Sequence, residues 1–233
     1  MSSIPEHLKQ VNQRIREAAE AWGRDCDDIQ LLAVSKTRTA DEIAEALKAG
    51  QHLFGESYLQ EALEKITALR GANAQWHYIG RVQSNKTRAI AENFDWVHSV
   101  DKAKQARRLN EQRPQNMPPL NVCLQIKVDE EESKGGLTAK EAEALIEEFS
   151  GFTRLRLRGL MTLPAPAEDF EGQRRPFCEL RRLRDRLATD EIPLETLSMG
   201  MSADIEAAIA EGATIVRAGT AIFGPRNPVI SRN

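Results

Sequence analysis

The chain has 233 residues, enough for one α/β barrel, a fold that usually needs about 250 residues. Apolar residues make up 41% of the sequence and charged residues 29%, so we expect a sizeable core beneath a well-solvated surface. Acidic and basic residues are interspersed, and the net charge of -3 offers no basic surface for nucleic acid. The first ten residues lack the apolar core of a signal peptide, and no apolar run is long enough to span a bilayer. We therefore expect a cytoplasmic protein that binds neither nucleic acid nor a membrane.

The cysteines and histidines show no metal-ligand spacing. The three cysteines are odd in number and widely separated, which favours reduced thiols in a cytosolic protein over a disulfide framework. Two of the four histidines, His77 and His98, fall in strand-like runs. For these two we expect hydrogen-bonded structural roles, and we predict no metal site.

In chain order, apolar residues at three- and four-residue spacing first predict a helix over residues 5–22, ended by Gly23. Eight strand-like runs follow. They span residues 31–35, 52–55, 76–80, 94–100, 120–128, 155–160, 194–197 and 213–217. Helical patterns separate them over residues 41–49, 58–69, 86–93, 101–112, 139–149, 170–188 and 203–211. Asp101 and Thr138 are the residue types that cap helix N-termini, and we predict that role for both.

Strands that alternate with helices through short loops predict parallel pairing with right-handed crossovers. Eight such units without a linker favour a closed (β/α)8 barrel, of the TIM-like kind, over an open sheet. We therefore predict one domain over residues 1–233, with the first helix as an addition to the barrel. Arg154, Arg156 and Arg158 alternate with apolar residues, a half-exposed pattern that is unusual in a parallel sheet. They either pass the outer helices, reach a pocket, or mark an edge strand.

Lys36 stands at the carboxyl end of the first predicted strand, which reads Leu31-Leu32-Ala33-Val34-Ser35. Burial lowers the pKa of a lysine, and a neutral amine is a nucleophile that forms Schiff bases with carbonyl compounds. The alternative is that the Lys36 stem covers apolar surface while its ammonium reaches water. The strand alone does not decide between these two roles.

Two loops at the ends of the last two strands have the composition of anion-binding segments. Residues 198–202 read Ser-Met-Gly-Met-Ser and run directly into a helix, whose first amides suit an anion, although Ser202 also suits a simple N-cap. After the eighth strand, Gly219 permits close backbone approach and Thr220 supplies a hydroxyl, while Arg217 points into the barrel mouth. In a closed barrel the first and eighth strands are neighbours, so Lys36 joins this group. A Schiff-base lysine, a phosphate cup and an arginine together predict a site for pyridoxal 5'-phosphate (PLP).

Other segments carry weaker signals. Residues 55–58 and 80–86 follow the second and third strands, where they suit either the pocket wall or turns and helix caps. Residues 133–136 read Ser-Lys-Gly-Gly, which lacks the GxxxxGK[ST] spacing of a P-loop. The sequence shows no Ser/His/Asp set and no paired carboxylates.

The chain resembles the pyridoxal phosphate homeostasis proteins, relatives of the alanine racemase N-terminal barrel. The matching motifs run in order through nearly the whole chain. They are LLAVSKT around Lys36, FGESYLQE from Phe54, HYIGRVQSNK from His77, RLRGLMTLPAP from Arg156, LSMGMSADIEAAI from Leu197 and VRAGTAIFG from Val216.

The resemblance implies the barrel of the third PLP fold type, with PLP held as an internal aldimine on Lys36. It further implies phosphate contacts at Ser202, Gly219 and Thr220. Arg217 would face the pyridine nitrogen and disfavour its protonation, which would leave the ring a poor electron sink. The remaining expected neighbours of the cofactor are Met199 and Gly80. Ser57 stands where the family commonly has asparagine, and the shorter side chain argues against a ligand contact there.

Three functions are compatible with these sequence features. We favour a PLP-binding protein of intracellular PLP homeostasis that buffers the cofactor or delivers it to apoenzymes through transient contact, and so affects amino-acid and keto-acid pools. The alternative is an amino-acid racemase or related PLP enzyme. Racemases add a C-terminal β-domain that brings a second base across a dimer interface; this chain ends at Asn233, so we expect neither that domain nor a dimer. Tyr58 and Tyr78 lie in earlier units and are poor candidates for that base. A third function is that of a cofactor-free barrel enzyme acting on phosphorylated metabolites.

Overall fold

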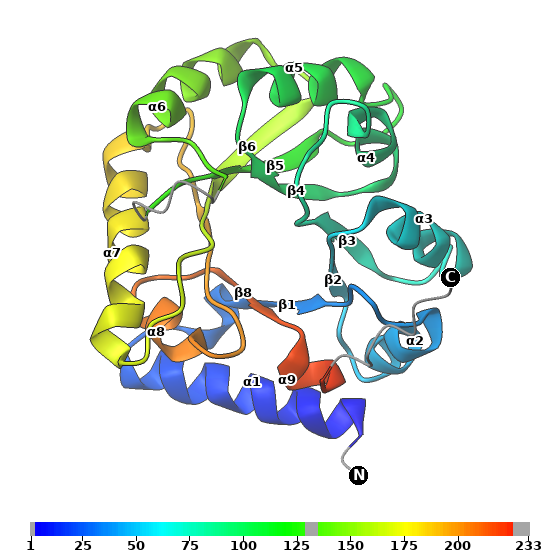
Figure 1. Cartoon of the computed structure of the whole chain (residues 1–233), viewed down its shortest axis with the longest axis vertical. Coiled ribbons are helices and arrows are strands. Elements are labelled where there is room, and N and C mark those ends of the chain that lie inside the picture. Colours follow the sequence, from blue (N-terminus) through cyan, green and yellow to red (C-terminus); the bar gives the residue numbers. More distant parts are fainter. Residues whose placement is uncertain (1–2, 129–134, 226–233) are drawn as a thin grey trace, which may run out of the picture.

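Eight parallel strands close into a barrel in sequence order, from β1 round to β8, with the helices outside it (Figure 1). The computed structural model describes residues 3–128 and 135–225. The strands are β1 (Gln30–Val34), β2 (Leu53–Glu56), β3 (Gln75–Tyr78), β4 (Trp96–Val100), β5 (Leu120–Gln125), β6 (Leu155–Met161), β7 (Thr196–Ser198) and β8 (Ile215–Ala218). The predicted (β/α)8 barrel is confirmed.

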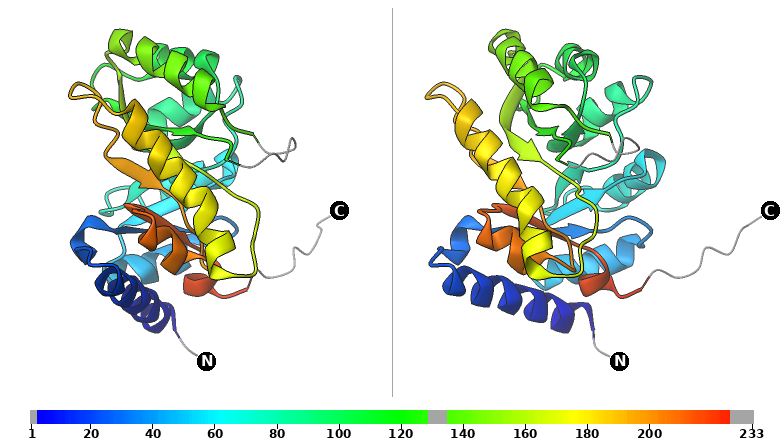
Figure 2. Two further views of the ribbon diagram at one scale, coloured as in Figure 1. Left: turned by 90° about the vertical axis from the view of Figure 1, so that its left-hand side faces the viewer. Right: turned by 60° about the vertical axis from the view of Figure 1, so that its left-hand side comes forward.

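The helices follow the predicted alternation. They are α1 (Ile4–Ala21), α2 (Ala40–Lys48), α3 (Leu59–Ala68), α4 (Thr87–Asn93), α5 (Ala103–Gln112), α6 (Ala139–Glu148), α7 (Phe170–Leu187), α8 (Ile205–Ala210) and α9 (Thr220–Phe223), with short 3-10 turns η1 (Cys26–Asp28) and η2 (Phe149–Gly151). Figure 2 shows α1 running along one side of the barrel, next to α8 and α9.

Three details differ from the sequence predictions. The fifth strand ends at Gln125, and the next residue, Ile126, pairs with Leu137 in an isolated bridge. The helix α9 was not predicted, since four residues are too short for a periodic pattern. Asp101 does not cap α5: Lys102 occupies the N-cap position, while Asp101 exchanges hydrogen bonds with the Gln105 amide. Thr138 caps α6 as expected.

The added helix α1 forms because Pro5 suits a first turn and Glu6 accepts a hydrogen bond from the backbone N–H of Ser3 at 2.8 Å. Its apolar stripe is buried and consists of Leu8, Val11, Ile15, Ala18 and Ala19. On its polar side, Arg14 donates two hydrogen bonds to the carboxylate of Glu206 at 2.8 and 2.9 Å. This bidentate pair ties α1 to α8.

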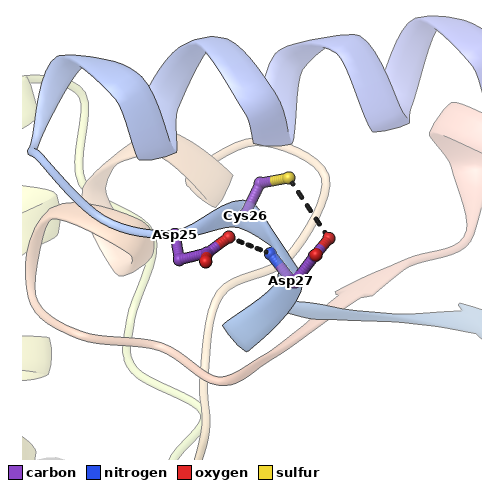
Figure 3. A group of neighbouring side chains, drawn as sticks. All are labelled: Asp25, Cys26 and Asp27. Carbon is purple, nitrogen blue, oxygen red and sulfur yellow. Dashed lines mark hydrogen bonds between the residues drawn. The ribbon is translucent and has the colours of Figure 1, made fainter.

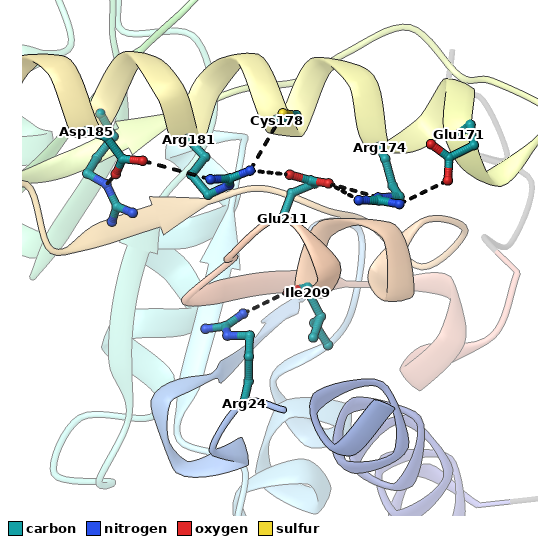
Figure 4. A network of polar contacts seen from close by, with 9 residues as sticks. Arg24, Glu171, Arg174, Cys178, Arg181, Asp185, Ile209 and Glu211 are labelled. Carbon is teal, nitrogen blue, oxygen red and sulfur yellow. Dashed lines mark hydrogen bonds and ion pairs between the residues drawn. The ribbon is translucent and has the colours of Figure 1, made fainter. Parts of the chain in front are cut away.

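A second ionic network ties α7 to α8 (Figure 4). The buried carboxylate of Glu211 accepts from Arg174 at 2.7 Å and from Arg181 at 3.0 Å. Burial would raise the pKa of Glu211, but the hydrogen bonds from both arginines outweigh it and lower the pKa. Arg24 donates to the carbonyls of Ile209 and Ala213 at 3.1 and 2.7 Å. The end of α8 is therefore held from two sides.

The arginines in and next to β6 have different surroundings. Arg154 donates to the carbonyls of Pro114 and Met117 in the loop before β5. Arg158 donates from Nε to Asn121 at 2.8 Å and lies over the ring of Trp96, while Arg156 is exposed. β6 pairs with both β5 and β7, so the edge-strand explanation is wrong.

The strand register brings distant segments together at the barrel mouth. Ala33 of β1 pairs with Ala218 of β8, and Val34 pairs with Gly55 of β2. The residues after β1 therefore lie between those after β8 and those after β2. The barrel interior holds an apolar cluster of Leu32, Trp96, Cys123, Met161 and Ile215.

Candidate functional site

A cavity of about 240 Å³ opens at the carboxyl ends of β1, β7 and β8. It is lined by Val34, Lys36, Arg38, Met201, Ser202, Ala203, Arg217, Gly219 and Thr220. Its volume is below the ~300–1,000 Å³ typical of pockets for drug-sized ligands, so it suits a small ligand. Five of the seven predicted cofactor residues meet in this cavity: Lys36, Arg217, Ser202, Gly219 and Thr220.

Arg217 is rigidly held on the barrel side of this cavity. Its side chain donates to Ser198 Oγ at 2.9 Å and to the carbonyl of Thr162 at 2.8 Å, and the residue is 4% exposed. Burial lowers the pKa of Arg217 to about 10, while the nearby carboxylate of Asp204 works in the opposite direction. The guanidinium therefore keeps its charge at neutral pH and presents a fixed cation to the cavity.

A chain of hydrogen bonds runs from Arg217 through the barrel interior. Ser198 Oγ lies 2.8 Å from His98 Nδ1, and His98 Nε2 lies 2.8 Å from His77 Nδ1. His77 Nε2 lies 3.0 Å from Gln75 Oε1. Gln75 Oε1 is the final acceptor of this chain. Arg217 therefore donates to Ser198, Ser198 donates to His98, and the neutral His98 donates to the neutral His77, which donates to Gln75. His77 and His98 are hydrogen-bonded inside the barrel, as their strand positions predicted.

Both histidines are fully buried, which disfavours their charged forms. Burial lowers the pKa of His77 to about 3. Burial also holds the pKa of His98 well below its ordinary value, with the nearby His77 and Arg217 acting in the same direction. A protonated His98 would place a second cation beside Arg217 without a counter-ion. The chain therefore supports Arg217 without adding charge.

The other side of the cavity presents backbone and hydroxyl donors. A Cβ on Gly219 would lie 3.2 Å from the carbonyl of Val34, so glycine allows β8 to approach β1 closely. Within the described residues, the backbone N–H groups of Ser202, Ala203 and Thr220 donate to no protein acceptor. Together with the hydroxyls of Ser202 and Thr220, these unpaired donors fit an anion such as a phosphate.

The loop that carries Ser202 has its own support. Asp204 Oδ1 accepts from the backbone N–H of Met201 at 2.5 Å. Gly200 adopts φ +89°, and a Cβ there would lie 2.5 Å from the Cβ of Ala208. Glycine is therefore required for the turn that leads from β7 into α8.

Two predicted neighbours do not line the cavity. Met199 is fully buried in the core between the strands and the helices, since side chains alternate along a strand and Ser198 takes the inward position. Gly80 packs against Ser57, whose carbonyl oxygen would lie 2.1 Å from an added Cβ. Conversely, the sequence argument missed Arg38 and Met201. The spacing of Arg38, two residues after Lys36, was the available signal.

The tyrosines lie away from this cavity. Tyr58 is 53% exposed, and Tyr78 is buried with its hydroxyl donating to the carbonyl of Arg81. Neither lines the cavity that contains Lys36. Residues 133 and 134 of the segment that lacks P-loop spacing lie outside the described residues.

Among the described residues, one group has the composition of a metal site: Asp25, Cys26 and Asp27 (Figure 3). Asp25 accepts from the backbone N–H of Asp27 at 2.9 Å and so caps η1. This capping role explains the exposed cluster without an ion. No helix among residues 3–128 and 135–225 is long and apolar enough to cross a membrane.

Comparisons with known proteins show the family of this chain. The family model described as "Alanine racemase, N-terminal domain" matches residues 7–227. The pyridoxal phosphate homeostasis protein of Pseudomonas aeruginosa is 54% identical over 227 residues, which cover 97% of each chain. The protein of the same name from Escherichia coli K12 is 47% identical, over 97% of this chain and 98% of that one. The chain belongs to the family of pyridoxal phosphate homeostasis proteins.

Several solved structures have the same fold as this chain. PipY from Synechococcus elongatus, solved without PLP, is 34% identical and superimposes with a TM-score of 0.84 over 95% of this chain and all of that one. PipY with PLP bound is 35% identical, with a TM-score of 0.78 over 90% of this chain. Alanine racemase from Corynebacterium glutamicum is 18% identical and superimposes with a TM-score of 0.69 over 97% of this chain and 63% of that one, a likeness that shows the fold alone.

Proposed function

We propose that this protein binds PLP covalently at Lys36 and takes part in PLP homeostasis. The observation that carries the proposal is that Lys36, the buried Arg217 and two loops with unpaired amides line one small cavity. The relatives named pyridoxal phosphate homeostasis protein, and the PipY structure with PLP bound, support the same ligand.

Each group in the cavity has a distinct part in this proposal. Lys36 supplies the amine for a Schiff base with the PLP aldehyde, whose conjugated ring otherwise serves PLP enzymes as an electron sink. Ser202, Gly219 and Thr220 would bind the phosphate. Arg217 would lie near the ring nitrogen, where its fixed positive charge would disfavour protonation of that nitrogen. An unprotonated ring withdraws electrons weakly, which suits storage of the cofactor better than catalysis.

The proposed role is that of a carrier without its own catalytic turnover. Racemisation needs acid/base groups on both faces of the substrate carbon, and neither Tyr58 nor Tyr78 lines the cavity with Lys36. Cavity access from the barrel mouth suits buffering of PLP and its delivery to apoenzymes. The cytoplasmic location and the monomeric state belong to this proposal too, and light scattering on the purified full chain tests the second.

The test is covalent trapping. Protein reconstituted with PLP is reduced with borohydride, and peptide mass spectrometry locates the label, which we expect on Lys36. Lys36→Ala should lose the visible Schiff-base band, while Lys9→Ala, at an exposed lysine of α1, should keep it. A label on another lysine in the wild type would contradict the proposed site. Steady formation of D-alanine from L-alanine would contradict the carrier role.

A further inference from the structure

Lys36 lies in a turn whose backbone is strained. Thr37, the next residue, adopts φ +65°, and Leu194 is the one other non-glycine residue in the described ranges with a positive φ. This left-handed region is unfavourable for a β-branched residue, because its Cβ crowds the neighbouring carbonyl. The conformation persists only if the surrounding structure holds it in place.

Three charged side chains from the next β/α unit hold this turn. They are Glu56 at the end of β2 and Glu61 and Lys65 on α3, and we call them the Lys36 support cluster. Glu61 Oε1 accepts from the backbone N–H of Thr37 at 2.6 Å. Lys65 Nζ donates to the carbonyl of Ser35 at 2.7 Å. The backbone is therefore fixed by hydrogen bonds at Ser35, immediately before Lys36, and at Thr37, immediately after it.

The cluster is also bonded internally and to the Ser35 side chain. Lys65 Nζ lies 2.8 Å from Glu56 and 2.5 Å from Glu61, and Ser35 Oγ donates to Glu56 at 2.6 Å. Glu56 is fully buried and Lys65 is 5% exposed. Such buried ion pairs add little stability compared with apolar packing of the same volume, but removing one partner leaves an uncompensated buried charge.

The cluster also distinguishes the two lysines near this turn. An ammonium has three N–H donors, and those of Lys65 are engaged by Ser35, Glu56 and Glu61. Lys65 is thus held as a charged structural donor. Lys36 lines the cavity.

We propose that the Lys36 support cluster positions Lys36 for attack on the aldehyde, with Glu61 as the positioning residue that maintains the left-handed Thr37. This inference rests on the proposed function of Lys36. An ordinary i,i+4 pair on a helix surface would also join Glu61 to Lys65. It would not explain why both head groups turn toward the Ser35–Thr37 backbone.

The test uses Glu61→Ala, which removes the acceptor at a side chain that is 31% exposed and so leaves the core intact. We expect the rate of Schiff-base formation with PLP to fall roughly tenfold, within the roughly hundredfold that a ~1 Å misplacement costs. Competitive acetylation of the PLP-free protein, read by mass spectrometry, should show a matching change in the reactivity of Lys36 relative to the other lysines. Glu64→Ala, at an exposed acid of the same helix, is the matched control and should change neither value.

Two further variants separate positioning from general stability. Glu61→Gln keeps a carbonyl acceptor and should retain most of the rate. The double variant Glu61→Ala/Thr37→Gly should form the Schiff base at least about threefold faster than Glu61→Ala alone, because glycine adopts φ +65° without strain. If Glu61→Ala lowers the unfolding midpoint but leaves Lys36 reactivity unchanged, or if the glycine gives no recovery, the positioning role is wrong. If Lys36→Ala still forms the Schiff base, the proposed function itself fails.

Discussion

Lys36 and Arg217 face the same cavity but are supported in opposite ways. Arg217 is held from inside the barrel by a neutral chain of Ser198, His98 and His77. Lys36 is held from outside the barrel by the charged support cluster. The difference follows from what each support contacts. The acceptors of Arg217 are neutral, and a protonated histidine in this chain would place a second cation close to the guanidinium. The strained backbone at Thr37 is held by charge-assisted hydrogen bonds, which are stronger than bonds between neutral groups.

The two supports should also respond to pH with opposite signs. The histidines have folded pKa values below the unfolded value, so their contribution is present above about pH 6.5 and is lost as the pH falls. Burial raises the pKa of Glu56, although Lys65 and Ser35 partly offset this. Its contribution is therefore present below the ordinary carboxyl pKa and is lost as the pH rises through the folded value.

The largest expected effect comes from acidification of the neutral chain. For His77, whose pKa falls to about 3, the free energy of unfolding should drop by up to about 1.4 kcal/mol per pH unit below pH 6.5, or about 3 kcal/mol by pH 4. Urea denaturation across this pH range measures the slope. His77→Gln should flatten it, whereas His52→Gln, at a histidine outside the barrel core, should leave it unchanged. Equal slopes for wild type and His77→Gln would refute the assignment.

The next effect comes from breaking the neutral chain at its centre. Ser198→Ala removes the hydroxyl that accepts from Arg217 and contacts His98, so two buried polar groups lose a partner. We expect a loss of about 2 kcal/mol in the free energy of unfolding, measured with urea at pH 7.5. PLP affinity should fall as well, because Arg217 keeps only its bond to Thr162. Ser198→Thr, which retains the hydroxyl, is the matched variant; an Ala variant as stable as the wild type would show that the chain is not a support.

The smallest effect comes from the corresponding serine of the charged support. Ser35→Ala removes the hydrogen bond to Glu56 Oε1, but Lys65 still donates to the same oxygen. We expect a loss of about 1 kcal/mol at pH 7.5 that becomes smaller in acid, as the ionised carboxylate needs the donor most. Urea denaturation at two pH values measures both quantities. If the loss of unfolding free energy caused by Ser35→Ala grew on acidification, the proposed opposite pH responses of the two supports would be wrong.

The sequence by itself determined the architecture and the core of the cavity. Apolar periodicity and short loops predicted eight alternating units, because burial on a barrel imposes a repeating pattern that is local in the chain. Closure of the barrel then requires β1 to lie beside β8, which places Lys36 near Arg217, Gly219 and Thr220. The loop after the seventh strand added Ser202 to this group, and the family resemblance implied the same residue.

Only the tertiary structure decided what holds these residues. Met199 lies in the core between the strands and the helices, because Ser198, the last residue of β7, takes the inward position. Gly80 packs closely against the backbone of Ser57. The links from His77 to His98 and from Glu61 to Thr37 join units that are separate in the chain. Such contacts depend on the directions of individual side chains across neighbouring strands, and no periodicity in the sequence records those directions.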